Sequence, residues 1–432
     1  MTESRQSVVP YFRPELTDAE IHEVVEALKS GWLTSGPRVK KFEEQFARAV
    51  GASHAVALNS CTAALHLAVE ALGLRSGEAV LVPTMTFAAT AEIVRYLGGL
   101  PILVDCEPET GNLDLADAAR KIEALRAGRL QDPFRASTRV VGIIPVHVGG
   151  RMVDPSSVRA FAAKENLWVV EDAAHAFPAS WRPDAMTPWQ RCGEKTADVS
   201  CFSFYANKTI TTGEGGMAVT EDAALADRMR LMSLHGLSRD AWERYSGGGW
   251  DYRIVAPGYK YNLTDLAAGI GLHQLERAET MRVRREEIAA RYREAFSGID
   301  ELEVPGDDPD RIHAWHLFPI RLRESALSVT RDEFIEVLKK EGIGCSVHWR
   351  PLHLHPYYQE TFRWAPSDLP VATAEWRRLI SLPIFPAMRE DEIASVTRVV
   401  SDLCARYSRG ASQSPSRAGQ TFVAAALAGE PS

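Results

Sequence analysis

Lys208 lies in the stretch SFYANKTITTGEGG (residues 203–216), between an aromatic-rich strand end and a run of small, hydroxylated residues that closes in paired glycines. A lysine that forms an imine must first lose its proton, and a low-dielectric cleft helps it to do so. Ser203, five residues earlier, could offer a hydroxyl group to an anion in the same place. A solvated surface lysine is the alternative that this stretch alone leaves open.

Two carboxylates follow an apolar run in VVEDAAHA (residues 169–176), where Glu171 and Asp172 come directly after the valines. An isolated buried carboxylate is costly, so a group in this position needs a cationic partner. A protonated pyridine nitrogen would serve as that partner, and so would an arginine. The motif by itself does not choose between a functional and a structural carboxylate.

Ser60, Cys61 and Thr62 lie where a strand gives way to a helix, in NSCTAAL. The N–H groups of a first helical turn can hold a phosphate, although an ordinary N-cap explains the same residues. Phe87 follows another strand end, where a ring either packs in the core or stacks on a flat ligand. Together with the lysine and the carboxylate, these features describe the requirements of one cofactor, pyridoxal 5'-phosphate (PLP).

The elements that must position these residues alternate along the first 260 residues. Short β-branched runs that end in polar or small residues are separated mostly by amphipathic segments with helical spacing. This order predicts a mostly parallel sheet with helices on both faces, and ligands gather at the carboxyl ends of such strands. The predicted strands lie within residues 55–60, 79–84, 101–106, 140–148, 167–174, 199–205 and 216–220.

The length of 432 residues exceeds the size at which one core usually stops growing, so we expect two domains. Residues 127–138 and 181–196 are expected to be loops of the large domain, and 345–350 is expected to be a strand of the small one. The tail is rich in small and polar residues and is expected to be disordered. The expected segments are an N-terminal arm (1–14), a large cofactor-binding domain (15–263), a linking helix (264–298), a small α/β domain (299–408) and the tail (409–432).

The composition argues against some classes of binding partner. The net charge of −8 argues against nucleic acid or an anionic membrane as the main partner. The N-terminus does not show the basic, apolar and small-residue order of a secretory signal peptide. No apolar run reaches the roughly 20 residues of a membrane span. Six cysteines are scattered without a CxxC pair, so we expect free thiols, a cytoplasmic protein and no metal site.

The sequence resembles the PLP-dependent nucleotide-sugar aminotransferases of the DegT type, which have the fold type I architecture of aspartate aminotransferase. The likeness runs from about Tyr11 to about Tyr407. It implies an α/β fold, with a mostly parallel mixed sheet flanked by helices in a large domain and a smaller C-terminal α/β domain. The matching motifs, in order, are GWLTSGPRVKKFEEQFA, NSCTAALHLAVEALGL, VPTMTFAATA, PVHVGG, VVEDAAHA, CFSFYANKTITTGEGG, GYKYNLTDLAAGIGLHQLE and GIGCSVHWRPLHLHPYY.

The resemblance implies roles for individual residues. Lys208 would hold the cofactor through an imine and move the proton during transfer, while Asp172 would pair with the pyridinium nitrogen. His175 would lie near the phenolic oxygen of the ring. Phe87 would stack on one face of the ring, and Ala174 would lie against the other.

The phosphate would be held by Ser60, Cys61, Thr62 and Ser203, with Asn262 reaching it from the neighbouring subunit. A homodimer is therefore expected to be part of each active site. The family often has a glycine where this chain has Cys61, and binding is expected to survive the change because backbone groups form the cradle. Weaker candidates for contacts with sugar or nucleotide are Trp32, Thr34, His348, Tyr357 and Tyr358.

The reaction implied is a ping-pong transamination from L-glutamate to a nucleotide-linked keto-sugar, in amino-sugar, polysaccharide or antibiotic biosynthesis. Amination at C4 is favoured over C3. The alternatives are an amino-acid lyase, a PLP- or pyridoxamine-phosphate-dependent sugar dehydratase, and a non-catalytic PLP-binding regulator. Relatives that remove oxygen instead of adding an amine have histidine at the lysine position, so Lys208 favours transamination.

Overall fold

The computed structural model describes residues 8–238, 252–306 and 308–411. The expected disorder of the tail from residue 412 onward, and the first seven residues of the N-terminal arm, lie outside the described residues. Among the described residues, no helix is both long and apolar enough to cross a bilayer.

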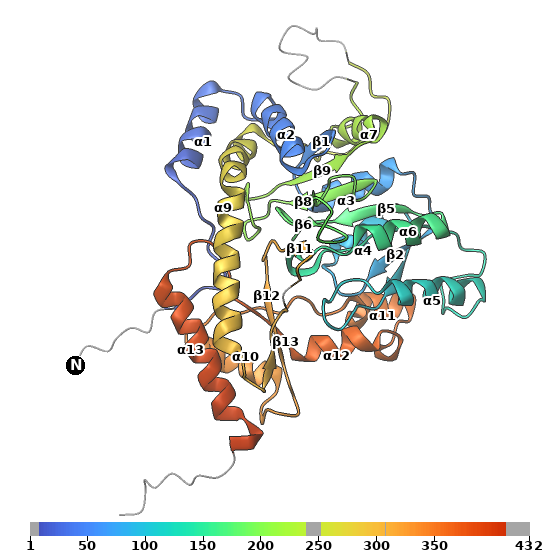
Figure 1. Cartoon of the computed structure of the whole chain (residues 1–432). Coiled ribbons are helices and arrows are strands. Elements are labelled where there is room, and N and C mark those ends of the chain that lie inside the picture. The colour runs from blue at the N-terminus through green and yellow to red at the C-terminus, as the bar shows by residue number, and fades with distance from the viewer. Residues whose placement is uncertain (1–7, 239–251, 307, 412–432) are drawn as a thin grey trace, which may run out of the picture.

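A seven-stranded sheet forms the centre of the fold (Figure 1). Only β9 runs against its neighbours, so the sheet is mixed but mostly parallel, as predicted. Each of the seven predicted runs overlaps one of these strands, although β1 and β3 begin one residue before the predicted run. In spatial order they are β1 (His54–Leu58), β9 (Gly216–Thr220), β8 (Val199–Ser203), β5 (Trp168–Asp172), β4 (Val140–Ile143), β2 (Ala79–Pro83) and β3 (Leu100–Val104).

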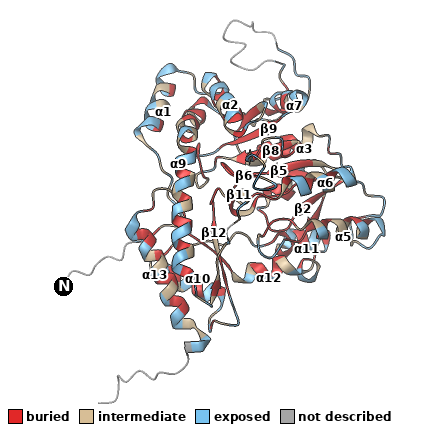
Figure 2. Ribbon diagram, in the orientation of Figure 1, coloured by how far each residue is buried: buried red, intermediate tan, exposed pale blue. Residues whose placement is uncertain are grey.

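Alternate residues of β1 enter two different cores, and helices cover both faces of the sheet. Val56 and Leu58 of β1 belong to one apolar cluster, whereas Ala55 and Ala57 belong to another. The first cluster includes residues of α3 (Cys61–Ala71), α4 (Ala89–Tyr96), α5 (Leu115–Arg126), α6 (Pro155–Glu165) and α7 (Ala223–Ser233). The second includes residues of α2 (Pro37–Val50) and of the long helix α9 (Asp265–Phe296). Figure 2 shows the central strands as almost wholly buried.

A smaller antiparallel sheet lies along the C-terminal part of α9 and has a core of its own around Tyr292, Phe318 and Phe334. Its strands are β10 (Leu302–Glu303), β12 (Phe318–Leu322) and β13 (Leu379–Leu382). Helices α10 (Arg331–Lys340) and α13 (Glu390–Tyr407) pack into the same core. The other helices of the described residues are α1 (Asp18–Ser30), α11 (Pro356–Phe362), α12 (Pro370–Arg378), η1 (Val148–Gly150), η3 (Leu352–Leu354), η4 (Pro366–Asp368) and η5 (Arg409–Ala411).

Two local expectations were wrong. The segment 181–196, expected to be a loop, contributes to a third sheet in which β6 (Ser180–Trp181) lies between β7 (Gln190–Arg191) and β11 (Arg311–Ile312). Two-residue strands carry no periodicity, and the partner β11 is distant in sequence. The segment 345–350 forms only an isolated bridge between Ser346 and Ser381. The expected loop at 127–138 contains neither helix nor strand.

Candidate active site

A cavity of about 570 Å³ opens at the carboxyl ends of the parallel strands. It lies where β5 and β8 end and α3 begins, which is the edge that the sequence pattern selects for ligands. Most of the predicted site residues are brought together here. Those that line the cavity are Ser60, Cys61, Thr62, Phe87, Asp172, Ala174, His175, Ser203, Lys208 and His348.

Lys208 lies in the turn after β8, where its backbone N–H donates to the carbonyl of Tyr205 at 3.0 Å. Desolvation by the surrounding protein lowers the pKa of its amine to about 8, while Cys61 and Asp172 nearby act in the opposite direction. A larger fraction of this amine is therefore neutral near physiological pH than for a solvated lysine. A neutral amine is the form that attacks a carbonyl group.

Asp172 ends β5 and is 6% exposed, so its carboxylate lies at the cavity wall almost without access to water. The hydroxyl group of Thr90 donates to its Oδ2 at 2.7 Å, and the N–H of Ala174 donates to its Oδ1 at 3.2 Å. Burial raises the pKa of Asp172, and these hydrogen bonds oppose the rise. The sequence analysis missed Thr90, whose only signal was a hydroxyl residue near the start of a helix.

His175 is held as a neutral ring with a defined tautomer. The backbone N–H of Gly149 donates to its Nδ1 at 3.3 Å, so the proton of the neutral ring is on Nε2. Burial, followed by the charge of Lys208, lowers the pKa of His175 well below its usual value. Its ring stacks on Trp349 at 5.0 Å and lies 4.2 Å from the ring of His316, measured between centroids.

The start of α3, which the sequence analysis predicts to hold a phosphate, lines the cavity. Ser60 is the N-cap and accepts a hydrogen bond from the N–H of Ala63 at 3.1 Å. Strand β9 packs closely against this turn. A Cβ on Gly216 of β9 would lie only 2.4 Å from the backbone carbonyl of Ser60. Burial raises the pKa of the Cys61 thiol well above its usual value, so the thiol stays uncharged and does not repel an anion.

Five of the predicted residues do not line this cavity within one chain. Asn262 donates from Nδ2 to the hydroxyl of Ser35 at 2.7 Å, and Tyr358 is buried in the core of the large sheet. Tyr357 is 46% exposed and accepts a hydrogen bond from Arg95 at 3.2 Å. The other two are Trp32, whose ring donates to the carbonyl of Ser35, and the exposed Thr34.

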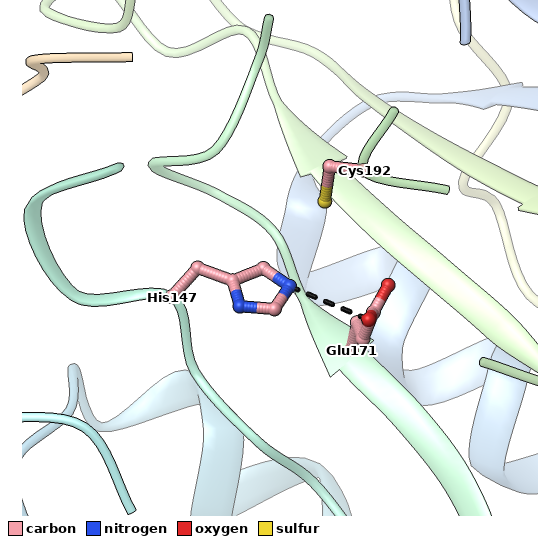
Figure 3. A group of neighbouring side chains, drawn as sticks. All are labelled: His147, Glu171 and Cys192. Atoms are coloured by element: carbon pink, nitrogen blue, oxygen red, sulfur yellow. Dashed lines mark ion pairs between the residues drawn. The ribbon is translucent and has the colours of Figure 1, made fainter. Parts of the chain in front are cut away.

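A second buried cluster lies on the other side of β5, where His147, Glu171 and Cys192 converge (Figure 3). Nε2 of His147 is 3.5 Å from Oε1 of Glu171, whose Oε2 accepts hydrogen bonds of 2.6 Å from Thr196 and Ser200. Burial alone would raise the pKa of Glu171, but these partners together lower it. Glu171 is thus a satisfied structural carboxylate, whereas Asp172 faces the cavity.

The tautomer of His147 does not suit a metal ion. The N–H of Val153 donates to Nδ1 of His147 at 3.1 Å, so the ring proton belongs on Nε2, the nitrogen that faces Glu171. A metal on Nε2 would require the ring to lose that proton while Nδ1 still accepts a hydrogen bond. Metal-bound histidines instead donate from their second nitrogen. The cluster is better described as a buried histidine–carboxylate pair.

The chain is similar to known proteins along most of its length. The model of the DegT/DnrJ/EryC1/StrS aminotransferase family matches residues 14–401. The spore coat polysaccharide biosynthesis protein SpsC of Bacillus subtilis is 43% identical over 405 residues, which cover 93% of this chain and 99% of SpsC.

Solved structures are similar over the same length. Spr1654 of Streptococcus pneumoniae in its pyridoxamine-phosphate form superposes with a TM-score of 0.81 at 28% identity, covering 93% of this chain and 98% of that one. A PLP form of the same protein is equally similar. DesI, solved in the presence of its TDP-sugar product, gives a TM-score of 0.78 at 30% identity and 94% coverage of both chains.

The residues of the cavity fit PLP. A lysine of lowered pKa, an aromatic ring, a buried carboxylate and the start of a helix surround one space of suitable size. Gly216 permits the close approach of β9 to the turn that is predicted to hold the phosphate, since any side chain there would overlap Ser60. Two polar atoms near the lysine, Oδ1 of Asn207 and Nδ1 of His316, are buried without a hydrogen-bond partner. A bound ligand could satisfy such atoms.

Proposed function

Because the chain belongs to the DegT/DnrJ/EryC1/StrS aminotransferase family, we propose that it transfers an amino group from L-glutamate to a keto carbon of a nucleotide-linked sugar. That it is a PLP-dependent sugar aminotransferase follows from the family and from its structural neighbours. The donor, the nucleotide and the carbon that is aminated are parts of the proposal, as is a cytoplasmic location.

We favour C4 of a 4-keto sugar as the acceptor and keep C3 as the second candidate. The support for C4 is the resemblance of GYKYNLTD, SFYANKTITTGEGG and EDAAHA to enzymes that act there. A nucleotide carrier is supported by DesI, which was solved with a TDP-sugar product. The dehydratase alternative is disfavoured because Lys208 occupies the position at which such relatives have histidine.

Within the cavity each residue has a separate task. Bound PLP supplies an electron sink for the carbon that loses or gains a proton. Asp172 offers an anion that keeps the ring nitrogen protonated, and Nε2–H of His175 is free to donate to the phenolic oxygen. In each half-reaction Lys208 would accept a proton from one carbon and then donate it to another, so one residue serves as base and then as acid.

The second subunit is also part of the proposal. Asn262 is half-buried outside the cavity, and Lys260 contacts its Oδ1. Helix α1 exposes Ile21, Val25 and Leu28, which are 58%, 38% and 54% exposed and follow helical spacing on one face. An apolar helix face of this kind is typical of a contact between copies of a chain. We propose that Asn262 reaches the phosphate bound by the partner.

The observation that carries the proposal is the convergence of Lys208, of lowered pKa, with Asp172 and the start of α3 in one cavity. The test uses Lys208→Ala and Lys208→Arg beside the wild-type protein loaded with PLP. Borohydride should trap the cofactor on Lys208 in the wild type only. L-Glutamate should convert the wild-type absorbance to that of the pyridoxamine form, and a panel of nucleotide-linked keto-sugars should reverse it. Wild-type protein that is not trapped at Lys208 would contradict the proposal.

A further inference from the structure

The cavity is poor in cations for a site that must bind acidic substrates. Among the described residues that line it, Lys208 is the only lysine, and none is an arginine. Lys208 is itself committed to the cofactor and to proton transfer. Three histidines line the same space, namely His175, His316 and His348. Of these, His316 has no role in the chemistry described above.

His316 reaches the cavity from the segment that leads into β12, so it belongs to the part of the chain that forms the smaller sheet. It is 5% exposed, and its Nδ1 is buried without a hydrogen-bond partner. Its ring lies 4.2 Å from that of His175. Burial and the neighbouring His175 and Lys208 lower the pKa of His316 well below its usual value, so the ring is neutral.

His348 stands near this ring with a different set of partners. Its Nδ1 lies 2.9 Å from the hydroxyl of Ser381 and 3.5 Å from the hydroxyl of Tyr11. Two hydroxyl groups that converge on one nitrogen fit a ring whose proton is on Nε2. Burial lowers the pKa of His348 to about 4, so this ring is neutral as well. The cavity therefore offers uncharged N–H groups beside Lys208.

A ping-pong enzyme must place two unlike groups beside the same reacting carbon. L-Glutamate brings a carboxylate, whereas the keto-sugar brings uncharged hydroxyl groups. An arginine would bind the carboxylate, but it would leave a desolvated cation without a partner when the sugar is bound. A neutral imidazole can donate to a carboxylate and can donate to or accept from a hydroxyl. Neutral histidines therefore suit both substrates.

We propose that His316, assisted by His348, binds the α-carboxylate of the amino donor in one half-reaction and a hydroxyl group of the sugar in the other. This inference rests on the proposed function and assigns a substrate-binding residue to it. His316 lines the cavity, and its Nδ1, which is buried without a hydrogen-bond partner, is the group that each substrate would satisfy in turn.

The experiment measures the two half-reactions separately by stopped-flow absorbance in PLP-loaded dimeric protein. The probes are L-glutamate for the first and dTDP-4-keto-6-deoxyglucose for the second, with the nucleotide sugar accepted by the wild type replacing the latter if the panel selects another. The variants are His316→Phe and His316→Gln. The matched control is His313→Phe, because His313 lies on the same segment but outside the cavity and bonds to the N–H of Trp315.

For His316→Phe we expect the dissociation constant of L-glutamate to rise about tenfold or more, and that of the sugar to rise about threefold to tenfold, in line with the loss of a charged and a neutral hydrogen bond. The maximal rates and the trapping of Lys208 should change little. His316→Gln should recover much of both affinities, and His313→Phe should match the wild type.

Two results would contradict this inference without contradicting the proposed function, provided that the wild type turns over its substrates. The first is unchanged L-glutamate binding in His316→Phe, which would assign the carboxylate to another group, such as an arginine of the partner. The second is an equal loss in His313→Phe, which would indicate a general structural effect. Failure of the wild type in both half-reactions would instead overturn the proposed function and this inference with it.

Discussion

The hydroxyl group of Thr90 donates a hydrogen bond of 2.7 Å to Oδ2 of Asp172, although the two residues are 82 positions apart in the chain. Thr86 lies 2.7 Å from the same hydroxyl group, and because Thr90 donates its proton to the carboxylate, Thr86 donates to Thr90. This chain of hydroxyl groups fixes one carboxylate oxygen and opposes the rise in the pKa of Asp172 that burial causes. These hydrogen bonds therefore favour the anionic form that we propose for Asp172 at the ring nitrogen of the cofactor.

Replacing Thr90 by valine should lower the turnover number about tenfold, because a hydrogen bond to a charged group contributes about 1.5–3 kcal/mol and its loss raises the pKa of Asp172. The measurement is the rate of the L-glutamate half-reaction in PLP-loaded protein. Thr90→Ser retains the hydroxyl group and should remain close to the wild type. Equal rates for valine and threonine at this position would show that Asp172 does not depend on this bond.

The lowered pKa of Lys208 predicts how the cofactor-free protein takes up PLP at different pH values. Only the neutral amine attacks the aldehyde, so the rate of imine formation should rise with pH, reach half its maximum near pH 8 and level off above it. For an ordinary lysine, with a pKa near 10.4, the rate of imine formation would still be rising at pH 10. The rate is followed by absorbance, and N-acetyl-lysine in solution corrects for the titration of PLP itself. A pH profile like that of N-acetyl-lysine would contradict the burial of this amine.

Gly216→Ala should distort the turn that we propose holds the phosphate. The new Cβ would lie 2.4 Å from the backbone carbonyl of Ser60 and 2.5 Å from the N–H nitrogen of Cys61, and neither backbone atom can rotate away. Overpacking of this kind costs about 1–3 kcal/mol, so the melting temperature and the affinity for PLP should both fall. Gly306→Ala is the control, since its Cβ would meet nothing within 4 Å. Unchanged affinity in Gly216→Ala would argue against this turn as the phosphate site.

The shared active site can be tested by mixing two defective proteins. Lys208→Ala lacks the reactive amine, and Asn262→Ala lacks the side chain that we propose reaches the partner's phosphate. In a mixed dimer, the subunit with Lys208 receives Asn262 from its partner, so one site is intact.

Random exchange makes half of the dimers mixed, and about one quarter of the sites should then be of wild-type composition. Activity after co-refolding should rise toward that fraction, while each variant alone stays low. A mixture no more active than its parts would place Asn262 in its own subunit's structure. Native mass spectrometry, with one variant made heavier by a tag, confirms that exchange has occurred.

The sequence by itself determined the large fold and the centre of the site. Seven β-branched runs became the seven strands of the main sheet because each is long enough for its apolar pattern to be visible. The same pattern indicated where those strands end, and strand ends at one edge of a parallel sheet must converge. Lys208, Asp172 and Ser60 follow such ends, so their meeting in one cavity was predictable.

Only the tertiary structure decided which polar groups satisfy one another. Glu171 and Asp172 are neighbours in an extended strand and therefore face opposite sides of the sheet, one toward His147 and the other toward the cavity. The contributions of Thr90 and His316 depend on packing between segments far apart in the chain, which local patterns do not encode. Tyr358 lies in the core because one face of α11, formed by Tyr358 and Phe362, packs into the apolar cluster of the large sheet. Local periodicity specifies strands and helices, but hydrogen bonds between distant segments exist only once the chain is folded.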